Sequence, residues 1–450
     1  MRDLDLSKIK NVHFIGIGGI GISAIARMML HDGKKVTGQD MQEGEIVSEL
    51  IKMGVDIKIG QSYENIPKDT GLIVYTIAID TYDPDLAKKI KEQTNIPIRS
   101  YPEMLGVISK DKYTIAVSGT HGKTTTTGMI AQILTSTEKD PTVIIGSLLA
   151  GNTSRADGRG TNFIAGKSNL LVVEACEYRR SFLNINPKIL VITNIDNDHL
   201  DYYKDIEDIK SAFHEMAMKV PEDGFVVCNR ADTNIADVLK DIKAKIIDWQ
   251  DYYDENLKLK VPGIHNKKDA AAALAVSGVL EVDKGLAIGF IGEFPGTWKR
   301  FEFRGTLPQG TLLYDDYAHH PTEIQATLEG FRELYPKEND WKITVVFQPH
   351  LFSRTKLLLD DFAKSFTDAD EVILLPIYYA REVDDGSISS EILSDRINKN
   401  TANSRAFKDF QSAESYIKDK FLVMNNKNVI VTMGAGEASK VGDYLLRNMI

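Results

Sequence analysis

The sequence predicts an α/β protein of three domains, each built on a mainly parallel sheet. Short apolar and β-branched runs alternate with helical segments along the whole chain, which is the pattern of strand–helix–strand units. Two of these runs end directly in glycine-rich turns. The length of 450 residues is too great for one hydrophobic core and, at about 150 residues per domain, predicts about three domains. We place them at residues 1–108, 109–297 and 298–450.

The first domain is expected to be similar to a dinucleotide-binding fold. Residues 11–19 form an apolar strand that ends in glycines, and residues 20–30 follow with the apolar spacing of a helix. Further strands are expected at residues 35–40, 72–76 and 96–99. These segments predict a small parallel sheet with flanking helices.

The turn after the first strand carries Gly16, Gly18, Gly19 and Gly21, and Asp40 closes the next strand. This spacing satisfies the fingerprint of dinucleotide-binding turns, in which the backbone approaches a pyrophosphate closely. The glycines and the helix N-terminus select only for a diphosphate, so any nucleotide diphosphate fits as well as a nicotinamide or flavin cofactor. A tight strand-to-helix turn without a ligand is the alternative interpretation.

The second domain is expected to be P-loop ATPase-like, because it opens with a strand, a glycine turn and a Thr-rich helix start at residues 113–127. The turn is a shorter variant of the usual motif, since Val117 stands where the first glycine belongs. Lys123 would reach the β- and γ-phosphates of ATP, and the Thr124 hydroxyl would bind Mg²⁺. The candidate ATP-binding residues of this loop are Gly119, Thr120, Gly122, Lys123, Thr124 and Thr125. An ordinary turn with a surface lysine is the alternative.

Carboxylates follow two further strands of the second domain, expected at residues 169–174 and 189–193. Glu174 ends the first of them and is a candidate Mg²⁺ ligand, because magnesium is usually bound by one or two carboxylates together with substrate phosphates. The second strand leads into residues 194–201, which hold three aspartates and His199. A solvated helix cap explains that segment equally well. We expect Cys176 to be a small buried side chain and no nucleophile.

Polar residues also follow the strands expected in the third domain, at residues 312–316, 343–347, 371–375 and 428–432. The carboxyl ends of parallel strands meet at one edge of a sheet, so these residues are expected to form a binding face that adds positive charge to a transferring phosphoryl group. The residues concerned are Arg300, Asp315, Asp316, His319, His350, Arg354 and Arg381.

The composition excludes several classes of protein. Lys plus Arg number 54 against 64 Asp plus Glu, and the net charge of −10 argues against a broad nucleic-acid surface. The sequence starts without an apolar signal region and contains no apolar run of membrane-spanning length. With only two cysteines a disulfide framework is not expected. We therefore expect a cytoplasmic protein without nucleic-acid, membrane or obligate protein partners.

The motifs together resemble those of the Mur ligases over essentially the whole chain, and within that family the enzymes that add L-alanine. The segments that carry the resemblance are residues 16–21, 119–124, 173–175, 193–201, 263–266, 315–323, 347–350, 380–383 and 434–436. The resemblance implies domains that bind a UDP-sugar, ATP and an amino acid in turn. It also implies an ADP-forming ligation of L-alanine to the lactyl carboxylate of UDP-N-acetylmuramate through an acyl phosphate, in peptidoglycan precursor synthesis.

The same resemblance implies roles for individual residues. Lys123, Glu174 and His199 are expected at the reacting groups with His350, Arg354 and Arg381. Mg²⁺ is expected on Thr124 and Glu174, with a second metal near His199. For the remaining residues, Asn266 is expected to read adenine, Arg300 and Asp316 to hold the nucleotide, and Gly16, Gly18, Gly19, Gly21, Asp40 and His319 to bind the sugar-nucleotide substrate.

Other functions stay open at the level of sequence. Relatives that attach a whole tripeptide to UDP-N-acetylmuramate share most of these motifs. A nicotinamide-dependent dehydrogenase would use the first glycine turn and Asp40, and a non-catalytic nucleotide-binding regulator would use both turns. The preference among L-alanine, glycine and L-serine, the oligomeric state, the metal shell around Cys176 and Glu177, and the identity of a general base are likewise open.

Overall fold

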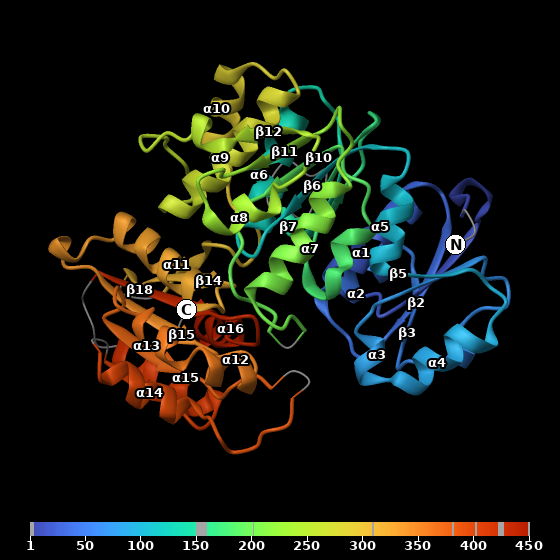
Figure 1. The fold of residues 1–450 in the computed structure, drawn as a ribbon. Helices are drawn as coiled ribbons and strands as arrows, with labels where there is room; N and C mark the ends of the chain where they lie inside the picture. The colour runs from blue at the N-terminus through green and yellow to red at the C-terminus, as the bar shows by residue number, and fades with distance from the viewer. Residues whose placement is uncertain are drawn as a thin grey trace. The chain divides into compact units, whose positions relative to one another are not determined.

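The computed structural model describes residues 4–149, 160–200, 202–307, 310–379, 382–400, 403–421 and 427–448. The chain divides into two compact units (Figure 1). The first comprises Met1–Tyr253 and Lys268–Glu293, and the second comprises Asp254–Lys267 and Phe294–Ile450. The first unit contains two sheets and the second unit contains one. The predicted three-sheet, mainly parallel α/β architecture is therefore confirmed, while the boundaries at 108/109 and 297/298 stay predictions.

The N-terminal sheet is fully parallel, with strand order β3-β2-β1-β4-β5. Helices cover both of its faces: Ile15 and Ile73 pack against α3 and α4, while Val12 and Phe14 belong to the core that includes α1, α2 and α5. The elements are β1 Asn11–Ile15, α1 Ile20–His31, β2 Lys35–Asp40, α2 Glu45–Lys52, β3 Asp56–Ile59, β4 Leu72–Tyr75, α3 Ile79–Tyr82, α4 Pro84–Gln93, β5 Ile98–Ser100 and α5 Tyr101–Ser109.

The central sheet has the order β12-β11-β10-β6-β9-β7-β8, in which only the β7–β8 pairing is antiparallel. Its middle strand β6 is buried throughout its apolar run, as expected for a parallel strand covered on both faces. The elements are β6 Tyr113–Ser118, α6 Lys123–Ser136, β7 Thr142–Leu149, β8 Thr161–Ile164, β9 Leu170–Glu174, the 3₁₀ segment η3 Tyr178–Asn184, β10 Ile189–Ile192, α7 Ile206–Met218, β11 Phe225–Cys228, α8 Thr233–Val238, β12 Lys245–Asp248, α9 Ile264–Val279 and α10 Lys284–Gly292.

The first two sheets share one hydrophobic core, which runs from Val12 and Phe14 to Phe182 and Phe213. Helix α1 packs against β7 and β8. The amide of Asn162 on β8 donates hydrogen bonds to the Ile20 carbonyl and to the Ser23 hydroxyl, at 2.5 and 2.8 Å. The N-terminal and central domains are thus joined by packing and by buried hydrogen bonds near the start of α1.

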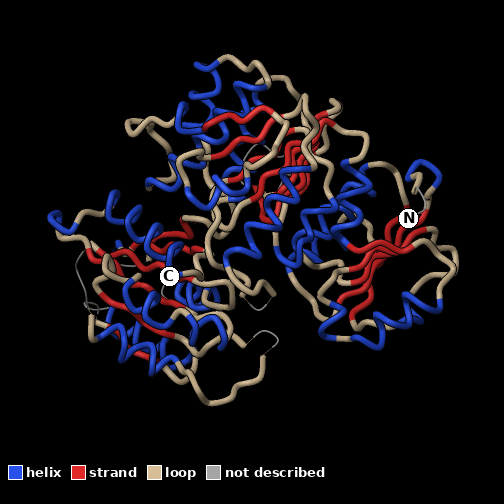
Figure 2. Tube along the Cα trace, in the orientation of Figure 1, coloured by secondary structure: helices blue, strands red, loops and turns tan. Residues whose placement is uncertain are grey.

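The C-terminal sheet has the order β13-β14-β18-β15-β16-β17, and only the edge strand β13 is antiparallel. The strands are drawn in red in Figure 2. Two separate hydrophobic cores cover its two faces. The elements are β13 Glu302–Thr306, β14 Leu312–Asp316, α11 Pro321–Leu334, β15 Lys342–Phe347, α12 Phe352–Leu357, α13 Leu359–Lys364, β16 Glu371–Leu374, α14 Ser390–Asn398, β17 Ser404–Ala406, α15 Phe410–Phe421, β18 Asn428–Met433 and α16 Ser439–Asn448.

The expected strands lie within about two residues of the observed ones, except that the strand expected over residues 11–19 ends at Ile15. The expectation did not include β3, β7, β8, β11, β12, β13 and β17, most of which are short or lie at a sheet edge. Within the described residues, no helix combines the length and the apolar character needed to cross a bilayer.

One buried histidine makes the stability of the N-terminal domain depend on pH. His13 on β1 is 1% exposed, and its ring nitrogens contact the Thr37 hydroxyl at 2.8 Å and the Gln39 amide at 3.1 Å. Burial lowers the pKa of His13 from 6.5 to about 4. The unfolded chain therefore binds a proton that the folded chain does not bind between these two pH values.

We predict that the domain loses ~3 kcal/mol of stability as the pH falls from about 6.5 to about 4. A His13→Gln variant keeps a hydrogen-bonding side chain but removes this titration, so its stability should fall less over the same range. Thermal unfolding midpoints of both proteins at pH 4–7.5 test this. Equal acid sensitivity of the two proteins would show that His13 does not contribute.

Candidate active site

The phosphate-binding turn follows β6 and requires glycine at two positions. Gly119 and Gly122 have positive φ angles of 137° and 82°. A Cβ atom on Gly119 would lie 1.9 Å from the Thr193 hydroxyl, and one on Gly122 would lie 2.4 Å from a carboxylate oxygen of Asp269. No side chain caps the start of α6, so the backbone N–H groups at the helix start are available to an anion. The N–H groups of Thr120 and His121, earlier in the turn, are instead bonded to Asn194.

Lys123 is folded back over this turn. Its Nζ donates hydrogen bonds to the carbonyls of Gly119 and Thr120 at 2.6 and 2.9 Å, and it pairs with the Glu177 carboxylate at 3.0 Å. Burial disfavours the charge, but the negative charges of Glu177 and Glu174 and the hydrogen bond to Glu177 act together with the other nearby groups to raise the pKa of Lys123 above its ordinary value. The lysine is thus held as a cation at the mouth of the turn.

Glu177 is a site residue that the sequence interpretation named only within an open metal shell, without a role. Its side chain is 2% exposed, and a carboxylate oxygen lies 3.5 Å from Nε2 of His199. Burial raises the pKa of Glu177, but the interactions with Lys123 and His199 together lower it by more than burial raises it. The pKa of Glu177 is therefore below its ordinary value. The signal available in the sequence was a second acidic residue only three positions beyond Glu174, in the segment that follows the strand.

Glu174 lies beside the threonine predicted to bind metal. The Thr124 hydroxyl donates to one carboxylate oxygen of Glu174 at 2.9 Å, and the Gly146 N–H donates to the other at 2.8 Å. The hydroxyl and the carboxylate are both hard oxygen ligands, the type that Mg²⁺ prefers. The first unit therefore brings Lys123, Thr124 and Glu174 together as expected.

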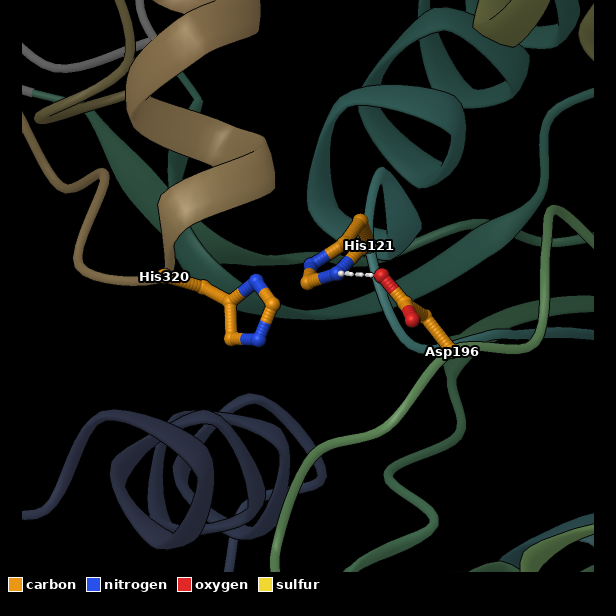
Figure 3. Close-up of side chains that lie close together, drawn as sticks. All are labelled: His121, Asp196 and His320. Atoms are coloured by element: carbon orange, nitrogen blue, oxygen red, sulfur yellow. Dashed lines mark ion pairs between the residues drawn. The ribbon is translucent and has the colours of Figure 1, made fainter. Parts of the chain in front are cut away.

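The segment after β10 packs directly on the phosphate turn. The side chain of Asn194 accepts from the His121 N–H at 2.9 Å and donates to the His121 carbonyl at 3.0 Å. Nε2 of His121 lies 3.4 Å from a carboxylate oxygen of Asp196 (Figure 3). His320, which the figure also labels, belongs to the second unit, where its ring caps α11 by accepting from the Thr322 N–H.

The aspartates of this segment bond nearby backbone donors but do not cap a helix, because α7 begins at Ile206 and is capped by Asp205. Asp196 and Asp198 each accept a hydrogen bond at 2.7 Å from the N–H of the following residue. His199 has a positive φ of 55°, and its ring lies 4.8 Å from that of Tyr178. Asp201 lies outside the described residues.

Cys176 corrects one expectation, because the structure places it at the surface and Cys228 in the core. The residue sits between Ala175, which is fully buried, and Glu177. Strand β9 ends at Glu174, so the alternation that would have pointed residue 176 inward no longer applies there.

The glycine turn of the N-terminal domain has no room for a side chain at Gly16 or Gly21. A Cβ atom on Gly16 would lie 2.4 Å from Thr76, and one on Gly21 would lie 2.7 Å from the ring of Tyr101. The Gly18 N–H donates to the Asp40 carboxylate at 2.8 Å. Gly19 precedes α1 without a side-chain cap, which leaves the helix N-terminus accessible to an anion.

In the second unit, Asp316 holds the loop around Arg300 in place. Its two carboxylate oxygens accept from the N–H groups of Phe301 and Ala318 at 2.7 and 2.8 Å. The guanidinium of Arg300 lies over the ring of Tyr317, at 5.1 Å. Burial raises the pKa of the neighbouring Asp315 to about 6.

Two of the predicted histidines meet at the same edge of the third sheet. The rings of His319 and His350 lie 6.0 Å apart, and Nδ1 of His319 is 3.2 Å from the Glu323 carboxylate. The ring of His350 also stacks on Tyr378. Arg354 lies in α12. The Asn266 amide, in the first turn of α9, donates a hydrogen bond to the Pro262 carbonyl. Arg381 lies outside the described residues.

Comparisons with known proteins agree with this architecture. Three family models match in succession: "Mur ligase family, catalytic domain" over residues 11–113, "Mur ligase middle domain" over 117–294 and "Mur ligase, glutamate ligase domain" over 299–436. The UDP-N-acetylmuramate–L-alanine ligase of Caldanaerobacter subterraneus is 41% identical, with 99% of both chains covered. The chain belongs to the Mur ligase family. The ligase of the same name from Clostridium acetobutylicum is 40% identical, again over 99% of both chains.

Solved structures place the chain in the Mur ligase fold over its whole length. The UDP-N-acetylmuramate–alanine ligase of Thermotoga maritima has a TM-score of 0.77 at 28% identity, covering 98% of each chain. A murein peptide ligase from Psychrobacter arcticus has a TM-score of 0.72 at 22% identity, covering 98% of this chain and 99% of its own. The second likeness is one of fold alone.

We predict that Gly119→Ala weakens the binding of Mg–ATP more than tenfold. The new Cβ would collide with Thr193, and alanine is strained at this positive φ, so the turn must open. Gly33→Ala is the matched control, because Gly33 also has a positive φ, 74°, but has no heavy atom within 4 Å of the added Cβ. Calorimetric titration of both variants measures the effect. If the two variants bind Mg–ATP alike, this turn is not the nucleotide site.

Proposed function

We infer that the chain is an ADP-forming ligase that joins the amino group of L-alanine to the lactyl carboxylate of UDP-N-acetylmuramate in peptidoglycan precursor synthesis. The observation that carries this inference is the identity of 40–41% over almost the full length of relatives named UDP-N-acetylmuramate–L-alanine ligase. It confirms the function predicted from the motifs. The phosphate turn after β6 and the glycine turn after β1 supply sites of the kind that the two nucleotide substrates need.

ATP is proposed to bind at the turn formed by residues 119–125. The N-terminus of α6 has no side-chain cap and is therefore suited to bind an anion. Lys123 at this position already carries a stabilised positive charge. Phosphate oxygens would replace the carbonyls of Gly119 and Thr120 as partners of the lysine, because charge-assisted hydrogen bonds are the stronger ones. Lys123 would then stabilise the charge on the transferring γ-phosphoryl group.

Mg²⁺ fits the oxygen pair formed by Thr124 and Glu174. These groups touch each other at 2.9 Å, and the remaining Glu174 oxygen is held by the Gly146 N–H, so the carboxylate is oriented in advance. A bound Mg²⁺ would neutralise charge on the phosphates. His199 fits Mg²⁺ less well, since imidazole is a softer ligand, and its contact with Glu177 supports a role through that carboxylate.

The reaction needs an activated carboxylate, because a free carboxylate is a poor electrophile. A lactyl oxygen attacks the γ-phosphorus of ATP and the bond to ADP breaks, which leaves an acyl phosphate. The amino group of L-alanine then attacks the acyl carbon, loses a proton, and expels inorganic phosphate. An unperturbed α-amino group has a pKa of about 7.7–8.0, so a modest shift supplies the neutral nucleophile.

In the second unit, we propose for these residues the roles that family membership implies. Asn266 would read adenine, Arg300 would hold the nucleotide, and His350, Arg354 and Arg381 would face alanine or the transferred phosphate. Asp316 is better suited to position the loop than to touch a ligand, because backbone N–H groups occupy both of its oxygens. Asp40 has a similar place in the first unit, where it orients the Gly18 N–H.

A ligase that attaches a tripeptide is less well supported, since the murein peptide ligase shares the fold at only 22% identity. We also propose a cytoplasmic location, because both cysteines are free thiols, as expected in a reducing compartment.

Phosphate release tests the proposed function. Purified protein should release phosphate only when UDP-N-acetylmuramate, ATP, L-alanine and Mg²⁺ are all present, and mass spectrometry should show the mass of the sugar nucleotide plus one alanine residue. Glycine, L-serine and the tripeptide serve as competing acceptors. Faster turnover with the tripeptide than with L-alanine, or reduction of a substrate by NAD(P)H, would contradict the proposal.

We predict that Lys123→Ala lowers turnover by at least about a hundredfold and leaves the Kd of UDP-N-acetylmuramate nearly unchanged. The lysine belongs to the ATP turn, whereas the sugar nucleotide is expected at the glycine turn of the other domain. Lys139→Ala is the control, because that lysine only caps a helix end through the Leu280 carbonyl at 2.8 Å. Steady-state kinetics and calorimetry measure both effects. More than a tenth of the activity remaining would remove Lys123 from the phosphate site.

A further inference from the structure

Two consecutive arginines follow Glu177 in the segment η3, and both adopt a left-handed backbone. Arg179 has φ 52° and ψ 31°, and Arg180 has φ 54° and ψ 26°. For residues other than glycine this conformation costs about 1–2 kcal/mol each. Backbone strain of this kind is found at sites where the surrounding structure fixes a side chain in a required place. The two arginines share sequence context, charge and backbone, but their side chains have different surroundings.

The side chain of Arg180 is held by ion pairs within the first unit. Its guanidinium forms ion pairs with Asp208 at 2.8 Å and with Glu215 at 3.1 Å, both on α7. These contacts join η3 to α7, next to the buried Phe182 and Phe213. Arg180 therefore has a structural role that accounts for its charge.

Arg179 is exposed and has no carboxylate partner among the residues that the structure describes. Its guanidinium lies over the ring of Tyr178 at 5.5 Å and donates a long hydrogen bond, 3.4 Å, to the hydroxyl of Thr81. Thr81 belongs to α3 of the N-terminal domain, so the side chain extends from the central domain to its neighbour within the first unit.

The Arg179 side chain lies between the two proposed nucleotide sites. At one end, the segment leading into and through α3 flanks the glycine turn: Thr76 and the Tyr82 hydroxyl lie 2.4 and 3.7 Å from a Cβ built on Gly16. At the other end, Arg179 is two residues beyond Glu177, the partner of Lys123. A sugar nucleotide with its diphosphate at the glycine turn and its carboxylate at the ATP turn would pass along Arg179.

We propose that Arg179 binds an anionic group of the sugar-nucleotide substrate between the N-terminal and central domains. The inference rests on the proposed function, which supplies the ligand. Both the diphosphate and the lactyl carboxylate present paired oxygens that match the planar fork of a guanidinium. A weak hydroxyl contact such as that with Thr81 is readily exchanged for a charge-assisted pair.

The test compares Arg179→Met with Arg180→Met by calorimetric titration. Methionine keeps an unbranched chain of similar length at the same backbone conformation and removes only the charge and the donors. For Arg179→Met we expect the Kd of UDP-N-acetylmuramate to rise about ten- to a hundredfold, with the Kd of Mg–ATP within twofold of wild type. Arg180→Met should lower the thermal midpoint and leave both Kd values within twofold. If the Arg180→Met variant does not fold, Arg180→Lys serves as the control in its place.

Two further measurements separate the sources of the anion and test the geometry of the fork. UDP-N-acetylglucosamine carries the diphosphate without the lactyl group, so an equal loss of its binding assigns the diphosphate, and an unchanged Kd assigns the carboxylate. Arg179→Lys keeps the charge and loses the bidentate geometry, and it should recover only part of the affinity.

The failures of the two proposals are distinguishable. If wild type does not bind UDP-N-acetylmuramate, the proposed function fails. If wild type binds it and Arg179→Met binds it within twofold, the assignment of Arg179 is overturned. Equal losses in the Arg179→Met and Arg180→Met variants would also overturn it, because they would indicate a general distortion of η3.

Discussion

The buried pair formed by Lys123 and Glu177 is the constraint on which the first unit's candidate site depends. A carboxylate that is 2% exposed is tolerated only with compensating charge, and leaving such a group unpaired costs roughly 3–5 kcal/mol. Lys123 therefore cannot leave Glu177 without a substitute. The pair holds the phosphate turn against the end of β9, and the Tyr203 hydroxyl donates to the Glu177 carbonyl from the segment after β10. An incoming phosphate would share the lysine with Glu177, which fixes where the γ-phosphoryl group can lie.

The same site follows from sheet topology. Strands β10, β6 and β9 are neighbours in the central sheet and run in the same direction, so their carboxyl ends meet at one edge. The loops that leave these ends carry Lys123, Glu174 and His199. For this reason the ends of the apolar runs in the sequence predicted that these three residues lie at one edge of the sheet. The third sheet repeats the arrangement with Asp316 and His350.

The sequence was less informative where tertiary contacts decide the outcome. The unpredicted strands are mostly short or lie at sheet edges, where pairing with a neighbour determines strand formation more than local propensity does. Cys176 was expected to be buried because free cysteines usually are, but it lies at the surface two residues after the strand ends. Glu177 gave no periodic signal, since its burial depends on Lys123 and His199, which lie 54 and 22 positions away in the sequence.

The left-handed residues around Glu177 show how the fold compensates local strain. Arg179, Arg180 and His199 all have positive φ angles, and His199 contacts the carboxylate directly. Arg180 offsets its strain through two ion pairs, and His199 through contacts with Glu177 and Tyr178. Arg179 gains from the fold only a long hydrogen bond and a contact with Tyr178. Its backbone is held by the contacts of the residues on either side, which limits the positions open to its exposed charge and would reduce the entropy lost if an anion bound there.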